Sequence, residues 1–258
     1  MGFGALSKSA EQPLSLTFLG IVTALNAEAK SLTKRRIGIG ELVQLPGGVL
    51  VQVSGVGARS ACLAARTLLG KGADALLIWG TAGGLISNLS PGSLVLPKTI
   101  IGADRSVYHT DAAWHRRLCS RLTGQIGFHE EPVVEGTVIL TRSIEKATLF
   151  RQTGAIAVDM ESAAVAAVAK GAGVPFMAIR AIADSVEIAI PQSALSFIDE
   201  FGRLNVSMLL KELAKHPKDF FTLVRLGRSF HAAETTLARV ARLAGSNLLV
   251  SAANGEQA

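Results

Sequence analysis

Short apolar runs alternate with stretches rich in alanine and leucine along the first 200 residues of the chain. Apolar runs bounded by Gly or Pro predict buried strands, and the Ala/Leu-rich stretches between them predict helices. Strands are expected at 16–22, 48–53, 75–79, 93–97, 138–140 and 174–184, with helices near residue 26, over 58–69 and from residue 163. This strand–turn–helix order predicts an α/β fold of three layers that contains parallel strand pairs.

The pattern changes beyond about residue 211. Residues 219–226 and 235–243 place apolar side chains on one side and arginines on the other, which predicts two amphipathic helices, the first of them begun by Pro217. From Arg203 onward, eight Lys and Arg stand against four Asp and Glu, in a chain of net charge +6. We expect a loose leader at 1–13, a folded domain at 14–210 and a basic helical tail at 211–258, whose last dozen residues are disordered.

Composition narrows the class of protein. A chain of 258 residues with 49% hydrophobic and 18% charged residues fits one large α/β domain or two small ones, and argues against disorder. Cys62 and Cys119 lack metal-ligand spacing, which indicates a reduced intracellular protein. The longest early apolar run, 14–25, is too short to span a bilayer, and no secretory signal is expected. The basic charge would suit nucleic acid, but the chain has no nucleic-acid-binding motif, so no such partner is expected.

Two glycine-rich segments, 55–57 and 80–84, each follow a predicted strand. Their backbone N–H groups could line a polar or anionic ligand, although tight turns alone would also explain the glycines. Neither is a Walker A loop, because no Gly-Lys-Ser/Thr is present. The first imitates part of a dinucleotide fingerprint, but its third glycine is missing. A nicotinamide-dependent oxidoreductase therefore stays an alternative.

Ionisable side chains stand where two core segments end. Arg180 and Asp184 share strand parity and should point to one side of the sheet, where a salt bridge between them is the alternative to a site. Asp159 and Glu161 precede a helix, so Asp159 could simply cap it, with Glu161 in its first turn. By the same logic Glu28, near a helix start, would be a surface residue. Burying such charges without partners costs several kcal/mol each, so we expect them to pair or to bind a polar ligand beyond the strand ends.

The five histidines show no metal-type clustering. Asp111 and His115, one helical turn apart, are interpreted as a surface pair. No Gly-x-Ser-x-Gly segment is present, and no Cys/His pair is apparent, so we expect no metal site and no nucleophilic triad.

Four segments, in this order, resemble the purine nucleoside phosphorylase and methylthioadenosine–adenosylhomocysteine nucleosidase family: IVTALNAE at 21–28, GTAGGL at 80–85, VDME at 158–161 and RAIAD at 180–184. The resemblance covers roughly residues 16–195. The sequence at 108–114 and the basic tail resemble the hopanoid-associated branch of this family. The enzymes of that branch are taken to remove adenine from adenosylhopane.

The resemblance implies a nucleoside phosphorylase-like α/β/α fold with a central mixed sheet, and makes residues 14–210 the catalytic domain. It implies that Asp184 protonates or hydrogen-bonds N7 of a departing purine, with adenine favoured, that Glu28 activates water, and that Glu161 holds the ribose hydroxyls. The remaining implied site residues are Met160, which packs on the sugar, Arg180 and Thr81, which order the nucleophile and the sugar, and Gly80 and Asp159 beside them. A base-stacking segment is expected near 143–144.

The resemblance also bears on co-substrates and partners. No metal or cofactor is implied, and inorganic phosphate would be a co-substrate only in a phosphorylase. Ile78 stands where bacterial hexameric phosphorylases carry a phosphate-binding arginine, and Glu28 stands where hydrolases keep their base, which favours water. Phosphorolysis stays an alternative, as does a non-catalytic nucleoside-binding or membrane-tethering module.

We expect a 5′-substituted adenine nucleoside, lipid-linked in the hopanoid branch, as the substrate of a cytoplasmic homo-oligomer. The basic tail either lies on an anionic membrane surface at the inner membrane face or packs on the body of the protein or on a second subunit.

Overall fold

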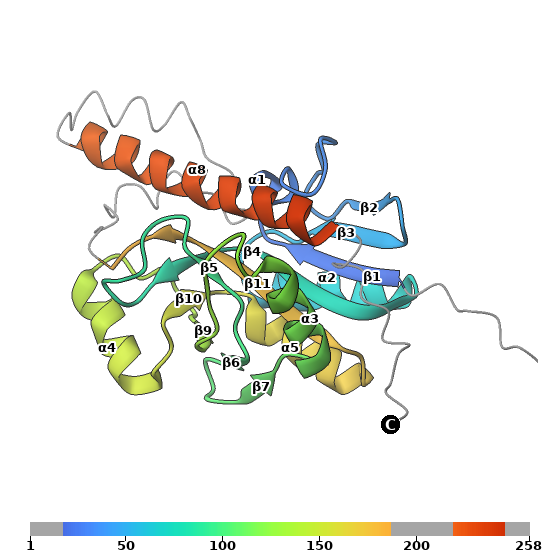
Figure 1. The fold of residues 1–258 in the computed structure, drawn as a ribbon. Coiled ribbons are helices and arrows are strands. Elements are labelled where there is room, and N and C mark those ends of the chain that lie inside the picture. The colour runs from blue at the N-terminus through green and yellow to red at the C-terminus, as the bar shows by residue number, and fades with distance from the viewer. Residues whose placement is uncertain (1–17, 187–218, 246–258) are drawn as a thin grey trace, which may run out of the picture.

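The structure, a computed structural model, describes residues 18–186 and 219–245 (Figure 1). The predicted leader at 1–13 and the last dozen residues of the tail lie outside the described residues. The strands are β1 (Phe18–Thr23), β2 (Leu42–Leu45), β3 (Val49–Val53), β4 (Ala73–Gly84), β5 (Leu94–Val95), β6 (Thr99–Ile101), β7 (Val107–His109), β8 (Phe128–His129), β9 (Val133–Glu135), β10 (Ala157–Asp159) and β11 (Phe176–Asp184). The helices are α1 (Asn26–Ala29), α2 (Ala58–Gly70), α3 (Ala112–Leu122), α4 (Ser143–Thr153), α5 (Ser162–Ala172) and α8 (Asp219–Ala244).

The described strands form one mixed sheet of 11 strands. Its centre is parallel, because β1 lies between β3 and β4, and β11 adds to the other side of β4. Antiparallel neighbours flank this centre: β2 pairs with β3, and β10 pairs with the last two residues of β4. The predicted mixed α/β sheet is therefore confirmed.

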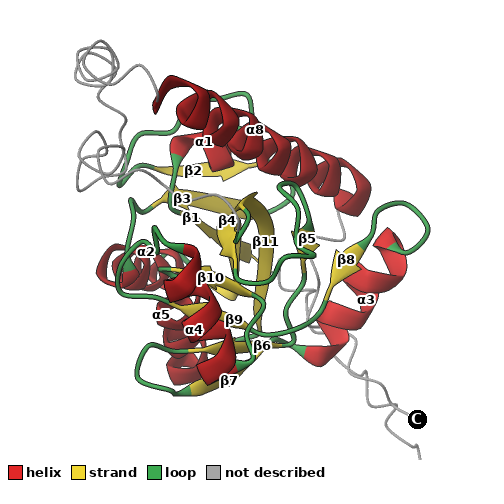
Figure 2. Cartoon of the chain, turned by 90° about the vertical axis from the view of Figure 1, so that its left-hand side faces the viewer, coloured by secondary structure: helices red, strands yellow, loops and turns green. Residues whose placement is uncertain are grey.

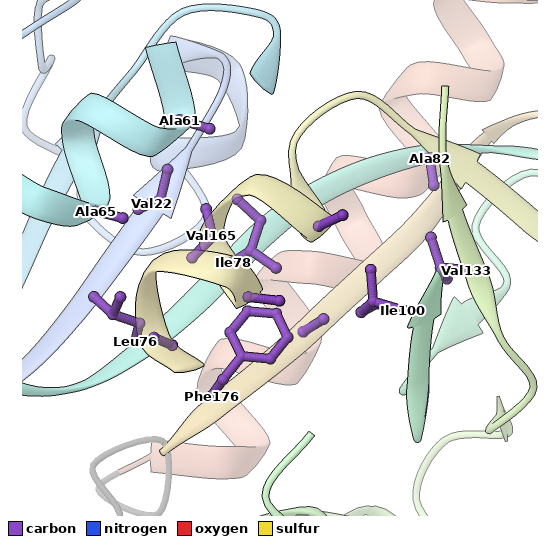
Figure 3. Packing of buried hydrophobic residues seen from close by; sticks show 14 of the residues in the cluster. Val22, Ala61, Ala65, Leu76, Ile78, Ala82, Ile100, Val133, Val165 and Phe176 are labelled. Carbon is purple, nitrogen blue, oxygen red and sulfur yellow. The ribbon is translucent and has the colours of Figure 1, made fainter. Parts of the chain in front are cut away.

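Helices cover both faces of this sheet (Figure 2). On one side lie α8 and α1, and on the other α2, α4 and α5. Because the central strands are buried on both faces, they read as continuous apolar runs. In β1, Ile21 packs into one core cluster and Val22 into the other. Figure 3 shows the second cluster, in which strand residues such as Ile78 and Phe176 meet Val165 of α5. The three layers expected from the sequence are confirmed.

Two sequence predictions about local structure are wrong. The glycine-rich segment 80–84 is not a loop after a strand but the second half of β4, because β11 and β10 pair with it. Residues 138–140 form no strand, since no strand pairs with them, and Val138 is 63% exposed. Helices α3 and α4 and several short strands were not predicted.

In the described part of the tail, residues 219–245, one helix, α8, stands in place of the two predicted within 219–243. One side of α8 is buried over residues 229–244. It carries Leu237 and Val240 together with the small side chains of Ser229, Ala233 and Ala244. The four apolar residues on this side join the core cluster that includes the odd-numbered residues of β11. Of the alternatives left open for the tail, packing on the α/β body is thus the one that this helix shows. Within the described ranges, no helix is both long enough and apolar enough to cross a membrane.

Candidate active site

A cavity opens where β4, β10 and β11 end, and it collects six of the eight residues proposed from the sequence. These six are Glu28, Thr81, Asp159, Met160, Glu161 and Asp184. Gly80 and Arg180 lie behind the cavity wall, each in contact with a carboxylate that lines it. The carboxylates of Glu161 and Asp184, 23 positions apart in the sequence, therefore face one hollow.

Glu28 is a buried carboxylate, only 1% exposed, so the surface interpretation from its helix position is wrong. One carboxylate oxygen accepts the backbone N–H groups of Ala24 and Leu25, both at 3.0 Å. The other accepts the N–H and the hydroxyl of Thr81, at 2.8 and 2.9 Å. Burial raises the pKa of Glu28, while the nearby Arg180 and these hydrogen bonds oppose the rise. A carboxylate whose pKa is raised in this way is a better proton acceptor than an exposed one.

The glycines of β4 make room for two carboxylates. A Cβ atom on Gly80 would lie 2.6–2.7 Å from the carboxyl group of Glu28, and one on Gly83 would lie 3.0 Å from Oδ1 of Asp184. Both glycines are therefore required by the close approach of acidic side chains to the strand, rather than by a turn.

Replacing Gly80 with alanine should displace Glu28 and break its bonds to Thr81. We expect a loss of about 1–3 kcal/mol in the free energy of unfolding, since the core beside this strand is close-packed. Urea denaturation measures the loss. The matched control is Gly171→Ala, because a Cβ there meets nothing within 4 Å in helix α5 and should leave stability equal or slightly higher. Equal stability of Gly80→Ala and the wild type would contradict the crowding.

Arg180, fully buried in β11, lies beside the carboxylates of Asp159 and Glu161. Its Nε lies 2.8 Å from Oδ2 of Asp159, and its Nη2 lies 3.8 Å from Oε2 of Glu161. The guanidinium also donates to the hydroxyl of Ser162. Asp159 also accepts the N–H groups of Glu161 and Ser162 just before and at the start of α5, but the N-cap residue of this helix is Glu161, not Asp159 as predicted.

Glu161 reaches across the cavity floor to the glycine segment 55–57. Its Oε1 accepts the N–H of Gly57 at 2.7 Å, so that donor serves the protein's own carboxylate. Gly55 and Gly57 have φ values of 82° and 102°, which only glycine adopts readily. Burial raises the pKa of Glu161 to about 7, against the opposing effect of Arg180. This carboxyl group therefore exchanges protons near neutral pH.

Asp184 does not form the predicted alternative salt bridge with Arg180 but pairs with Lys146 of α4. Lys146 Nζ also donates to the carbonyl of Ser185 at 2.9 Å, and the side chain is 1% exposed. Burial raises the pKa of Asp184, and the Lys146 ammonium opposes the rise. Lys146 was missed because a lysine among polar helix residues resembles a surface position. The available signal was its place three residues before Leu149, on the side of α4 that meets the core.

Apolar side chains form the outer wall of the cavity. Val138, Ile139 and Leu140 line it, with Val138 63% and Ile139 39% exposed. Residues 143–144, near which a base-stacking segment is expected, begin α4 and do not line the cavity, and Ile144 is 61% exposed. An apolar wall with this exposure can contact a flat base or an apolar substituent.

The expectations for His115 and the cysteines need correction. His115 is 3% exposed and bonded to the carbonyl of Leu96, so it is not part of a surface pair, and Asp111 instead caps α3. Ligand atoms of His115, Cys119 and Glu130 lie within 4.8 Å of one another, a cluster that the sequence spacing did not suggest. Burial and Glu130 raise the pKa of the Cys119 thiol to about 11, so the thiol keeps its proton at neutral pH.

Comparisons with known proteins assign the family. A family model described as the phosphorylase superfamily matches residues 25–215. The 5′-methylthioadenosine/S-adenosylhomocysteine nucleosidase of Shewanella baltica (strain OS155) is 29% identical over 190 residues, 64% of this chain and 80% of the relative.

Two solved structures share the fold. The futalosine hydrolase of Helicobacter pylori strain 26695 superposes with a TM-score of 0.65 at 18% identity, covering 88% of this chain and 97% of its own. The Neisseria meningitidis 5′-methylthioadenosine/S-adenosylhomocysteine nucleosidase, in complex with methylthio-immucillin-A, gives 0.65 at 18% identity, with 88% and 98% covered. With more than half of its length matched by the family model, the chain belongs to the phosphorylase superfamily and is one of the enzymes that cleave N-glycosidic bonds.

Proposed function

We propose that this enzyme hydrolyses the N-glycosidic bond of an adenine nucleoside. Glu28 takes a proton from the attacking water, and Asp184 supplies a hydrogen bond or a proton to N7 of the departing adenine. Glu161 holds the ribose hydroxyls, and Met160 packs against the sugar. Curated relatives named as methylthioadenosine/adenosylhomocysteine nucleosidases support an adenine nucleoside as the substrate.

The observation that carries the proposal is that one cavity holds two separate sets of carboxylates. Glu28, Asp159 and Glu161 gather around Arg180, and Asp184 pairs instead with Lys146. Cleaving the bond between C1′ and N9 builds positive charge on the sugar and negative charge on the base. Carboxylates stabilise the first, and a proton donor or cation stabilises the second.

The distribution of cations supports water over phosphate as the nucleophile. Of the described residues that line the cavity, Lys146 alone is cationic, and its ammonium is bound to Asp184 and Ser185. Arg180 behind the wall is bound to Asp159, Glu161 and Ser162. A phosphate ion placed beside these carboxylates would meet repulsion without a free guanidinium to offset it.

Thr81 has a specific part in this proposal. Glu28 accepts four hydrogen bonds, which fills the lone pairs of a carboxylate. Three of the donors are backbone N–H groups with fixed directions. The Thr81 hydroxyl alone can rotate away, and its departure would free Oε1 of Glu28 to accept a proton from water.

The finer proposal is that the 5′-position of the nucleoside carries an apolar group, with adenosylhopane as the best candidate. The exposed wall of Val138 and Ile139 supports it, since apolar surface at a cavity mouth favours an apolar substituent. The exposed side of α8 carries Arg225, Arg228 and Arg242, a charge pattern that suits an anionic membrane in which such a lipid would reside.

Chromatography of adenine released from adenosylhopane, methylthioadenosine and adenosine, with and without phosphate, tests the proposal. We expect release in phosphate-free buffer at the same rate as with phosphate, and a loss of about 10²- to 10⁴-fold in Glu28→Gln, as for removal of a general base. Glu131→Gln, which changes an exposed glutamate, is the control. Release that requires phosphate would replace hydrolysis with phosphorolysis, and no release from any nucleoside would overturn the proposal.

A further inference from the structure

A lysine from helix α4 reaches the cavity beside Asp184. Lys146 lines the cavity with Asp184, yet its side chain is 1% exposed. A buried ammonium group without partners would cost several kcal/mol. Here its Nζ donates to Oδ2 of Asp184 and to the carbonyl oxygen of Ser185, which satisfies most of its donors. The pairing fixes the ammonium beside the proposed acid.

The ion pair with Lys146 uses only one of the two carboxylate oxygens of Asp184. Oδ2 is occupied by the ammonium, while Oδ1 lies over Gly83, where a Cβ atom would come within 3.0 Å of it. The ion pair restrains the carboxyl group through Oδ2, and the missing side chain of Gly83 leaves room for Oδ1. Oδ1 is thus the oxygen that remains to hydrogen-bond a purine in the cavity.

The two buried cations of the site, Lys146 and Arg180, pair with different carboxylates. Arg180 is engaged by Asp159 and Glu161, so the positive charge nearest to Asp184 is that of Lys146. A bare carboxylate would repel a base that gains negative charge as it departs. The ammonium offsets that repulsion at the moment the bond breaks.

We propose that Lys146 is the positioning residue of this enzyme's leaving-group acid, a role that rests on the proposed function. It orients Asp184 and offsets the negative charge of that carboxylate. As the C1′–N9 bond breaks, its electron pair goes to the base, and the Lys146–Asp184 pair delivers one proton to N7. The pair regains a proton from water after adenine leaves.

The test compares Lys146→Met and Lys146→Arg, each in the wild-type and the Asp184→Asn background, with adenine release as the readout. Lys146→Met should lower kcat about 10²-fold with KM nearly unchanged, because the loss concerns the leaving group. Lys146→Arg should recover at least about tenfold of that loss, since it restores the cation. In the Asp184→Asn background, adding Lys146→Met should lower kcat by less than about threefold relative to Asp184→Asn alone. The further loss is small because Lys146 acts through Asp184. Lys71→Met, an exposed lysine at the end of α2, is the control.

The pH profile separates positioning from simple structural support. Without the ammonium the pKa of Asp184 rises further, so the limb of the kcat/KM profile that reports this group should move to higher pH. A folded Lys146→Met enzyme with wild-type kcat and pH profile would overturn the inference, as would losses that multiply with those of Asp184→Asn. If Lys146→Met does not fold, Lys146→Gln replaces it under the same criteria. A wild-type enzyme that releases no adenine overturns the proposed function and this inference together, whereas an active wild type beside an equally active variant overturns the inference alone.

Discussion

Replacing Asp184 with asparagine is expected to slow adenine release by about 10²- to 10⁴-fold, the usual contribution of a positioned acid. Asparagine keeps the shape of the side chain and an oxygen for Lys146, but it cannot deliver a proton to N7. Since a missing acid raises the barrier of the chemical step alone, the loss should appear in kcat, with KM changed little. Initial rates of adenine release over a range of nucleoside concentrations measure both.

The control for this experiment is Asp104→Asn, which changes an exposed aspartate in the turn between β6 and β7. Its rate should equal that of the wild type. Because the exchange leaves the Lys146 ammonium without an anionic partner, the melting transition of Asp184→Asn must be recorded beside its activity. A folded Asp184→Asn enzyme that retains more than half of the wild-type kcat would remove Asp184 from the mechanism.

Arg180→Met should reduce the free energy of unfolding by about 3–5 kcal/mol, the cost of removing one partner from a buried ion pair. Methionine fills much of the same space, but Asp159 and Glu161 then remain buried, at 6% and 5% exposure, without their cation. The loss should grow with pH. Without Arg180 the folded-state pKa of Glu161 rises above its present value of about 7, so the folded variant holds its proton more tightly than the unfolded chain and is destabilised as the pH increases.

Urea denaturation at pH 5 and pH 8 checks both statements. Arg35→Met is the matched control, because it removes an ion pair with Glu41 whose side chains are 63% and 39% exposed. Exposed pairs contribute about 0–1 kcal/mol, so this variant should stay close to the wild type at both pH values. Equal losses in the two arginine variants, or a loss in Arg180→Met that does not change with pH, would show that the buried network contributes no special stability.

The sequence predicts most of the fold's centre because central strands and the helices between them carry strong patterns. Strands β1, β3 and β11 have apolar runs with glycine or proline near their ends, helix α2 is rich in alanine and leucine, and the structure places all four within a few residues of the prediction. Residues 138–140 have an equally apolar run, yet no strand lies beside them. Whether an apolar run forms a strand thus depends on a neighbouring strand to pair with, and the local sequence does not show whether one is present.

The site was predictable in part, and the physical reason is different for each residue. Asp159, Glu161 and Arg180 stand out because charges at the ends of core segments need partners. Glu28 lies in a single-turn helix whose position alone suggested the surface, and the resemblance to a family was needed to place it in the site. Lys146 was missed, and outside the site His115 was wrongly placed at the surface, because burial of a polar helix residue is set by what packs over the helix, not by its neighbours in sequence.

Helix α8 has a consequence for how this protein is made. The strand that bears Arg180 and Asp184 buries its opposite side, Met177, Ile179 and Ala181, in the cluster that contains Ala233 and Leu237. During synthesis that side of β11 stays open until some sixty further residues have emerged from the ribosome, as the numbering requires. The strand that bears Arg180 and Asp184 is therefore among the last parts of the nascent chain to be covered, and until α8 packs on it a chaperone could bind its apolar side.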